Sequence, residues 1–297
     1  MNEEILYLNG QFQLLSEGRI SIEDRGFQLG DGVYEVIKVL NGTIIWLEDH
    51  LERLESSLRA IRLVEVLDDY SFATILPELV KRSAISEGYV YLQITRGYAP
   101  REFTFPRPAH PTVLAYARAK KFPTREEIYQ GLVLYPVEDL RWAHCDIKST
   151  NLLAAVLAKE EAWEAGADEA LFVSSEGIVR EGGSSNVFAV IDGVLRTHPL
   201  NNRILGGITR KYILIFAEQL GIPVKEEAFN LNELIDGSGN CTEVFSASTT
   251  KDLVPVNRVG ETVIGDGQPG PVTLGILEAM QKGHAKLTGL PEPAPLN

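Results

Sequence analysis

The amino-acid sequence predicts a mixed α+β protein with a smaller N-terminal domain and a larger, strand-rich C-terminal domain. Strand-like runs joined by Asn-Gly, Glu-Gly or Asp-Gly turns alternate with amphipathic helices along the chain. A polar stretch, "KKFPTREE", separates two halves that differ in their pattern of expected strands and helices. We therefore expect a domain at residues 1–120, a linker at 121–127 and a second domain at 128–297.

The N-terminal domain is expected to contain a β-hairpin followed by helices. "VYEVIKVL" and "TIIWL" are typical of strands around Asn41-Gly42, a pair that type I′ turns prefer. Leucines then recur at helical spacing in residues 48–63. A second helix is expected over residues 72–88, with Pro77 inside it or at its true start. Two further strands, rich in β-branched and aromatic residues, are expected at 89–97 and 111–119.

The C-terminal domain is expected to mix hairpins with helices. Its first helix covers residues 149–166, because Ser149 or Thr150 can cap its start and Gly166 can end it. "DEALFVSSEGIVREG" and "SSNVFAVIDGVLRTH" are typical of two successive hairpins. The other expected elements are a strand at 131–137, a helix at 208–221, a strand that runs into the Ser/Thr cluster at 246–250, and a closing helix at 272–287.

Composition and charge argue against several classes of function. The formal net charge of −13 argues against a nucleic-acid backbone or an anionic membrane as the partner. The 2 cysteines form no CxxC pair, so neither a disulfide framework nor a metal site is expected. No apolar run approaches the ~20 residues that span a bilayer. Because "MNEEILYLNG" also lacks a signal-peptide pattern, we expect a cytoplasmic protein.

Lys148, in "CDIKSTN", is the first candidate for chemistry. If a helix starts at Ser149 or Thr150, its unpaired N–H groups and positive dipole end would lie beside the amine. That field, together with burial after Ile147, would lower the pKa of the lysine and make it a Schiff-base nucleophile or a proton carrier. Taken alone, a solvated surface lysine is the more common case.

Three polar turns could surround a flat, phosphorylated ligand. In "REGGSSNVF", Glu181 could meet a protonated ring nitrogen, and the glycines allow close backbone approach. Ile208 and Thr209 follow a Gly-Gly pair at an expected helix start, where free N–H groups bind phosphate. The hydroxyls of "SASTT" also suit phosphate oxygens. Each motif alone is more often a simple turn or cap, but together with the lysine they favour pyridoxal 5′-phosphate.

A substrate carboxylate has its own candidate residues. In "GDGVYEVIKV", a strand would place Tyr34 and Glu35 on opposite faces, so one of them must point inward. Tyr34 with Arg101 could bind a carboxylate, because a phenol and a guanidinium both donate hydrogen bonds. Arg53, on the first long helix, is either a solvated side chain or a phosphate clamp.

Six segments, in order over nearly the whole chain, resemble those of the class IV (fold type IV) pyridoxal-phosphate aminotransferases, most closely the D-amino-acid branch. These segments are "EDRGFQLGDGVYEVIKV", "ITRGYAPR", "EDLRWAHCDIKSTNLL", "EGGSSNVFAV", "THPLNNRILGGITR" and "STT". The resemblance implies a homodimeric enzyme with the type IV fold. It would move the amino group of D-amino acids to 2-oxo acids, 2-oxoglutarate or pyruvate, by a ping-pong mechanism.

The resemblance also implies the role of each candidate residue. Lys148 would form the Schiff base with the cofactor and move the proton at Cα. Glu181 would pair with the pyridinium nitrogen, and Leu205 would pack against the ring. Tyr34 would border the site, and Arg101 would reach the substrate carboxylate across the dimer interface. The phosphate would be held, partly through backbone N–H groups, by Arg53, Ile208, Thr209, Ser248 and Thr249.

Phe103 departs from the pattern of the D-amino-acid branch, where the position two after the arginine is typically histidine. One hydrogen-bond donor to the carboxylate is then missing, and such a charge-assisted bond contributes about 1.5–3 kcal/mol. Its loss would weaken carboxylate binding roughly ten- to a hundredfold. An (R)-amine transaminase is therefore an alternative. A branched-chain transaminase, an aminodeoxychorismate lyase and a non-catalytic binding protein of the same fold are the others.

Overall fold

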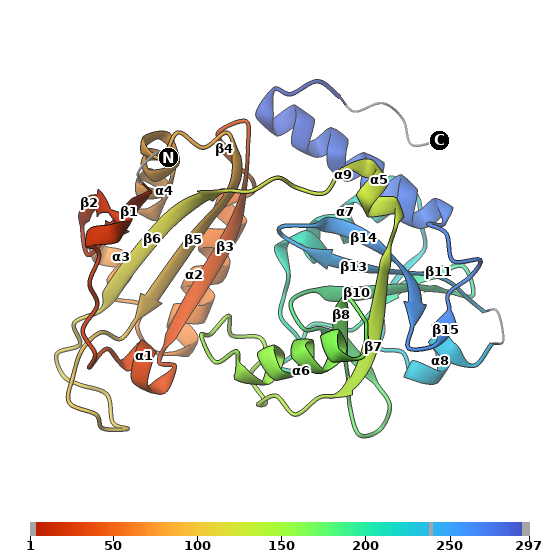
Figure 1. Ribbon diagram of the computed structural model, residues 1–297, viewed down its shortest axis with the longest axis horizontal. Coiled ribbons are helices and arrows are strands. Elements are labelled where there is room, and N and C mark those ends of the chain that lie inside the picture. Colours follow the sequence, from red (N-terminus) through yellow and green to blue (C-terminus); the bar gives the residue numbers. More distant parts are fainter. Residues whose placement is uncertain (1–3, 238–239, 293–297) are drawn as a thin grey trace. The chain divides into compact units, whose positions relative to one another are not determined.

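The computed structural model describes residues 4–237 and 240–292, so the ends of the two expected domains, residues 1 and 297, lie outside it. The chain divides into two compact units (Figure 1). The first unit contains Met1–Phe122, Ile147–Asn151 and Leu287–Leu290. The second unit contains Pro123–Asp146, Leu152–Lys286 and Pro291–Asn297. Lys148 therefore lies in a short segment that belongs to the first unit.

An antiparallel sheet forms the centre of the first unit, in the order β2-β1-β6-β5-β3-β4. Its strands are β1 (Ile5–Leu8), β2 (Gln11–Leu14), β3 (Gly32–Leu40), β4 (Thr43–Ile44), β5 (Glu87–Thr95) and β6 (Thr112–Ala119). The helices are α1 (Arg25–Leu29), α2 (Leu47–Ala60), α3 (Val66–Asp69) and α4 (Phe72–Arg82), with a 3₁₀ turn at Leu15–Glu17.

Helices α2 and α4 pack against this sheet and build the core of the first unit (Figure 1). Burial alternates along β5, as expected of a strand with one face toward the core and one face away from it. On the inward face, Ile37 and Leu92 are buried together with Leu58 of α2 and Leu76 of α4. This burial of apolar surface is the main stabilising contribution to the unit.

The hairpin predicted at Asn41-Gly42 is confirmed. Both residues have positive φ, 49° for Asn41 and 71° for Gly42, as a type I′ turn requires. Leu40 and Thr43 pair across the turn and join β3 to β4.

A sheet with parallel and antiparallel pairs forms the centre of the second unit, in the order β12-β11-β10-β13-β14-β7-β8-β9, with β15 beside β14. It is curled, because β9 at one end also contacts β10. The strands are β7 (Leu132–Glu138), β8 (Glu169–Val173), β9 (Val179–Gly182), β10 (Asn186–Ile191), β11 (Val194–Thr197), β12 (Val224–Glu226), β13 (Cys241–Ser248), β14 (Asp252–Val259) and β15 (Thr262–Val263).

The helices of the second unit are α5 (Arg125–Tyr129), α6 (Leu153–Glu164), α7 (Ile208–Gln219), α8 (Leu231–Ile235) and α9 (Pro271–Thr288). Of these, α5 packs against β14, α6 packs against β7 and β8, and α7 packs against β12 and β13. Both units combine a β-sheet with helices, which confirms the predicted α+β class. No helix in the described part of the chain is long and apolar enough to span a membrane.

Two sequence predictions about helix bounds were wrong, and two strands were missed. Helix α4 ends at Arg82, and Gly88 instead lies in β5, where a Cβ would come 2.0 Å from the carbonyl oxygen of Arg118. Helix α6 begins at Leu153 without a side-chain cap, so neither Ser149 nor Thr150 caps it. Strands β1 and β2 were not predicted at all, although Asn9-Gly10 between them has the positive φ values of a hairpin turn.

Candidate active site

Lys148 is fixed to strand β3 of the first unit through its backbone. Its carbonyl accepts the N–H of Tyr34 at 3.0 Å, and Ser149 forms a bridge with Val33. The Lys148 N–H donates to Oγ of Ser57 at 3.3 Å. The expected helix start beside the amine is absent, because α6 begins five residues later. The backbone of Lys148 is therefore held by β3 and α2.

The side chain of Lys148 lies over an aromatic ring. Its Nζ is 4.4 Å from the centroid of Tyr34, within the range of a cation–π contact. Tyr34 stacks on Tyr91 with 5.8 Å between ring centroids, and Tyr91 stacks on Tyr116 at 5.2 Å. Tyr34 therefore has a supported orientation and presents its ring to the lysine.

Glu35 points into the core behind Tyr34 and pairs with α2. It accepts hydrogen bonds from Nε and Nη2 of Arg53 at 2.8 and 2.7 Å, and it contacts Nδ1 of His50 at 2.8 Å. Burial raises the pKa of Glu35, but Arg53 and then His50 outweigh it and lower the pKa to about 2. Arg53 is thus an oriented partner of a buried carboxylate and not a solvated side chain. Its phosphate role stays a prediction.

Arg101 and Phe103 lie in the loop that joins β5 to β6. Both are exposed, and 84% of Phe103 is accessible. The Arg101 guanidinium lies 5.8 Å from the centroid of the Phe103 ring. Tyr34, by contrast, contacts Lys148 and Tyr91. The expected carboxylate-binding pair of Tyr34 and Arg101 stays a prediction.

Glu181, at the end of β9 in the second unit, is a buried carboxylate with three donors. It accepts hydrogen bonds from Arg141, from Nδ2 of Asn186 at 3.0 Å and from the N–H of Leu205 at 3.0 Å. Burial raises the pKa of Glu181 to about 7, although Arg141 acts in the opposite direction. A carboxyl group with a pKa near 7 is stabilised in its ionised form by a further positive neighbour, such as a protonated ring nitrogen.

The segment that leads into α7 contacts this carboxylate. Leu205 donates to Glu181, and its carbonyl accepts Nδ2 of Asn186 at 2.9 Å. The first hydrogen bond of α7 runs from Lys211 N–H to the Gly207 carbonyl, and no side chain caps the helix. The amides of Ile208 and Thr209 therefore lack partners within the helix, and free amides of this kind are suited to a phosphate.

The end of β13 approaches the same region of the second unit. Asn186, at the start of β10, pairs in register with Ala247, and Ser248 follows directly. Thr249 lies in the turn that leads to β14. Asn186 also leaves no room for a side chain at position 207, because a Cβ on Gly207 would lie 2.1 Å from Oδ1 of Asn186. Asn186 thus connects the carboxylate, the helix start and the strand end.

This set of residues fits pyridoxal 5′-phosphate. A buried carboxylate suits a basic ring nitrogen, and an uncapped helix start with nearby hydroxyls suits a phosphate. Both belong to the second unit and are joined through Leu205 and Asn186. In the first unit, the amine of Lys148 stays the predicted partner of an aldehyde.

Sequence reasoning missed Arg141, Asn186 and His50. Arg141 also pairs with Asp139, two residues before it, at 2.9 Å. "EDLR" and "SSNVF" were both noted in the sequence, yet nothing local indicates that Arg141 and Asn186 converge on Glu181. An Asn directly before a buried strand, with both a donor and an acceptor to satisfy, is the signal that could have identified Asn186.

The protein has an α+β fold of type IV, and the residues around Glu181 and the start of α7 suit a phosphorylated, nitrogen-containing ring. The chain matches the family model "Amino-transferase class IV" over residues 32–259, and it belongs to this family. It is therefore a pyridoxal-phosphate-dependent aminotransferase that acts on amino and 2-oxo compounds, as predicted from the sequence.

Relatives of the chain are named for different enzyme activities. The D-alanine aminotransferase of Staphylococcus haemolyticus is 41% identical over 93% of this chain and 96% of its own. The branched-chain amino acid aminotransferase of Escherichia coli has a TM-score of 0.85 at 24% identity, covering 98% of this chain and 96% of its own. The 4-amino-4-deoxychorismate lyase of Pseudomonas aeruginosa has a TM-score of 0.78 at 26% identity, covering 93% and 98%.

Proposed function

We propose that the protein transfers the amino group of D-amino acids to 2-oxo acids, 2-oxoglutarate or pyruvate, in a ping-pong cycle. The observation that carries this choice is the 41% identity to a D-alanine aminotransferase over 93% of the chain. The branched-chain and lyase neighbours share 24% and 26%. D-Amino acids are therefore favoured as donors over branched-chain L-amino acids.

Pyridoxal 5′-phosphate, when bound, supplies a ring that accepts the electrons left at Cα when its proton departs. Glu181 would hold the ring nitrogen, and Leu205 would pack against the ring. The residues that would hold the phosphate are Arg53, Ile208, Thr209, Ser248 and Thr249.

Lys148 would carry out two tasks from a fixed backbone. Its amine would hold the cofactor aldehyde, and when free it would take the proton from Cα of the donor. The backbone bonds to Tyr34 and Ser57 hold the base of the side chain. The ring of Tyr34 stabilises the ammonium form that proton uptake produces.

Glu181 would keep the ring nitrogen protonated. A carboxylate surrounded by donors from Arg141, Asn186 and Leu205 cannot rotate away without breaking those bonds. Its pKa near 7 indicates that a proton or a cation is readily accommodated there. The proton on the ring nitrogen would lie between two bases and stay bound.

The carboxylate of the donor would be bound by Arg101 of a partner subunit in a homodimer, with Tyr34 at the border of the site. Phe103 supplies no hydrogen bond, so Arg101 is left as the main donor of its loop. An exposed phenylalanine at this position favours one second candidate, an (R)-amine transaminase, because an amine without a carboxylate does not need the missing donor.

One assay separates these candidates. D-Alanine, L-leucine and (R)-1-phenylethylamine are supplied separately with 2-oxoglutarate, and initial rates are compared. The proposal expects D-alanine to be the best donor. A faster rate with L-leucine or with the amine would replace it by the branched-chain or the (R)-amine activity. A purified protein whose cofactor band does not change with any donor would indicate a non-catalytic binding protein.

A further inference from the structure

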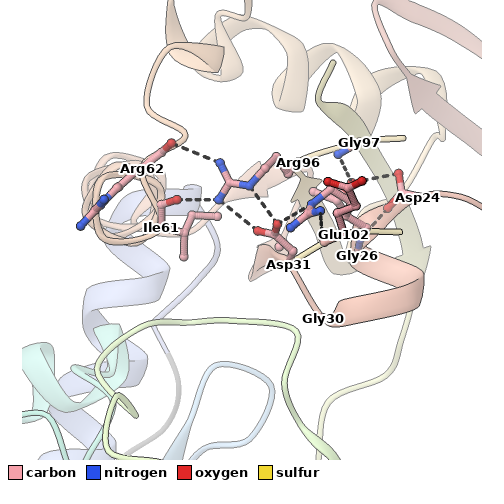
Figure 2. Close-up of polar contacts among 12 residues, drawn as sticks. Asp24, Gly26, Gly30, Asp31, Ile61, Arg62, Arg96, Gly97 and Glu102 are labelled. Atoms are coloured by element: carbon pink, nitrogen blue, oxygen red, sulfur yellow. Dashed lines mark hydrogen bonds and ion pairs between the residues drawn. The ribbon is translucent and has the colours of Figure 1, made fainter. Parts of the chain in front are cut away.

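We propose that Arg25, Asp31 and Arg96 form a clamp that positions the loop carrying Arg101 and thereby sets the affinity for the donor's carboxylate. The inference rests on the proposed function, because Arg101 is the expected carboxylate ligand. The loop is residues 98–110, between β5 and β6, and it is called the Arg101 loop below. Figure 2 shows Asp31 and Arg96 of the clamp, with Ile61 and Arg62 beside them.

Asp31 holds two buried arginines at once. Its Oδ2 accepts hydrogen bonds from Nε of Arg25 and from Nε of Arg96, each at 2.8 Å, and its Oδ1 accepts Nη2 of Arg96 at 3.0 Å. Both arginines are 2% exposed. Since two cations share one carboxylate, the remaining guanidinium donors must find other acceptors.

Arg96 uses its remaining donors to attach the clamp to the end of helix α2. Nη2 donates to the carbonyl of Ile61 at 2.6 Å and Nη1 donates to that of Arg62 at 3.2 Å (Figure 2). The carbonyl end of a helix favours a cation, so this contact compensates the second positive charge. The clamp is therefore anchored to the core of the first unit.

Arg25 and Arg96 then reach the Arg101 loop. Nη1 of Arg25 donates to the carbonyl of Glu102 at 2.5 Å, the residue between Arg101 and Phe103. The guanidinium of Arg96 lies 3.7 Å from the centroid of the Phe105 ring. The side chains at the loop tip are exposed, so these two contacts replace the apolar packing that would otherwise hold it.

The segment that carries Asp31 also holds the lysine segment. Gly30, with φ of 66°, ends α1, and Arg96 N–H donates to the Asp31 carbonyl at 3.0 Å. The next carbonyl, of Gly32, accepts the N–H of Thr150 at 3.0 Å. One short segment thus contacts both the base of the Arg101 loop and the segment that carries Lys148.

The test uses the holoenzyme with Arg25→Lys. A lysine keeps the charge but cannot bond Asp31 and the Glu102 carbonyl with a rigid fork. We expect KM for D-alanine and the inhibition constant of propionate, a carboxylate without an amine, to rise together by about tenfold, or about 1.4 kcal/mol. We expect kcat to stay within about twofold, and amide hydrogen exchange in residues 98–110 to become faster.

Two further variants keep the inference open to contradiction. Phe105→Ala removes a loop contact of Arg96 without touching the buried network, and it should shift the same quantities in the same direction. Arg59→Lys alters an exposed arginine of α2 and is the matched control, with no change expected. Unchanged loop exchange in Arg25→Lys and Phe105→Ala would overturn the clamp, as would a fall in kcat without a change in KM.

Failure of the proposed function has a different signature. If Arg101→Ala leaves KM and the propionate constant unchanged, Arg101 does not bind the carboxylate. Hydrogen exchange of the loop then decides on its own whether the clamp holds the loop.

Discussion

Lys148 and Tyr34 are joined twice, once through the backbone and once through the side chains. The N–H of Tyr34 donates to the carbonyl of Lys148 at 3.0 Å, and the lysine Nζ lies 4.4 Å from the centroid of the tyrosine ring. The lysine amine is therefore held beside an aromatic face before any ligand arrives.

Removing the amine should abolish the reaction. We expect Lys148→Ala to lose turnover and the cofactor absorption near about 400 nm, because no Schiff base can form with the protein. Lys120→Ala, at an exposed lysine of the same unit, should keep both. Turnover that survives in Lys148→Ala would exclude Lys148 as the nucleophile.

The ring of Tyr34 should matter more than its hydroxyl for the lysine. Tyr34→Phe keeps the aromatic face, whereas Tyr34→Leu removes it and costs about 0.5–2 kcal/mol of cation–π stabilisation. We expect kcat to be roughly two- to thirtyfold lower in Tyr34→Leu than in Tyr34→Phe. Equal kcat values in steady-state assays of the two variants would contradict this role.

Glu181→Gln should slow the chemistry while the protein still folds. An amide does not stabilise a protonated ring nitrogen, so we expect kcat to fall by about a hundredfold, in the range found when one electrostatic partner is removed. Glu176→Gln, in the exposed turn before β9, is the matched control. A kcat within about twofold of the unmodified enzyme would show that this carboxylate is not needed.

Glu35 should make the fold sensitive to acid. Its folded pKa of about 2 lies below the ordinary value of 4.5, so the ionised group stabilises the protein above about pH 4.5. This contribution, on the order of 3 kcal/mol, is lost as the pH falls toward 2. Urea unfolding at pH 6 and pH 3 should therefore show a smaller change for Glu35→Gln than for the unmodified protein. Equal changes would refute the assignment.

Gly207 should tolerate no side chain. A Cβ there would lie 2.1 Å from Oδ1 of Asn186, so Gly207→Ala must displace the residue that links Glu181 to the start of α7. We expect at least about tenfold weaker cofactor binding in titrations of the cofactor-free enzyme. Gly275→Ala, within helix α9 and with only ordinary contacts, should bind as before and gain about 0.5–1 kcal/mol of stability. Unchanged affinity in Gly207→Ala would refute the linking role of Asn186.

Local signals were enough to predict most elements. Asn41-Gly42 determines its turn by backbone conformation alone, and the helical spacing of Leu51, Leu54 and Leu58 anticipated α2. The predicted start of α6 was wrong because Ser149 instead forms a bridge with Val33, which lies more than a hundred residues earlier in the chain. A local sequence pattern cannot reveal this long-range contact, which takes the place of helix capping by Ser149.

The candidate site divides in the same way. Glu181 stood out as an acid in a glycine-rich turn, and Ile208 and Thr209 stood out as a helix start. Arg141 and Asn186 did not, because their importance lies in contacts that appear only once distant segments fold together. Arg53 could be assigned to a buried partner only after β3 had placed Glu35 inside the core.

The clamp has a consequence for how this enzyme can change over evolutionary time. Losing Asp31 alone would leave two buried arginines without their shared counter-ion, so its loss is expected to be tolerated only together with changes at Arg25 and Arg96. Phe103, at the exposed end of the loop, carries no such constraint. A population of related sequences can therefore explore new amino donors by single substitutions at the tip, while the base that aims the loop is inherited intact.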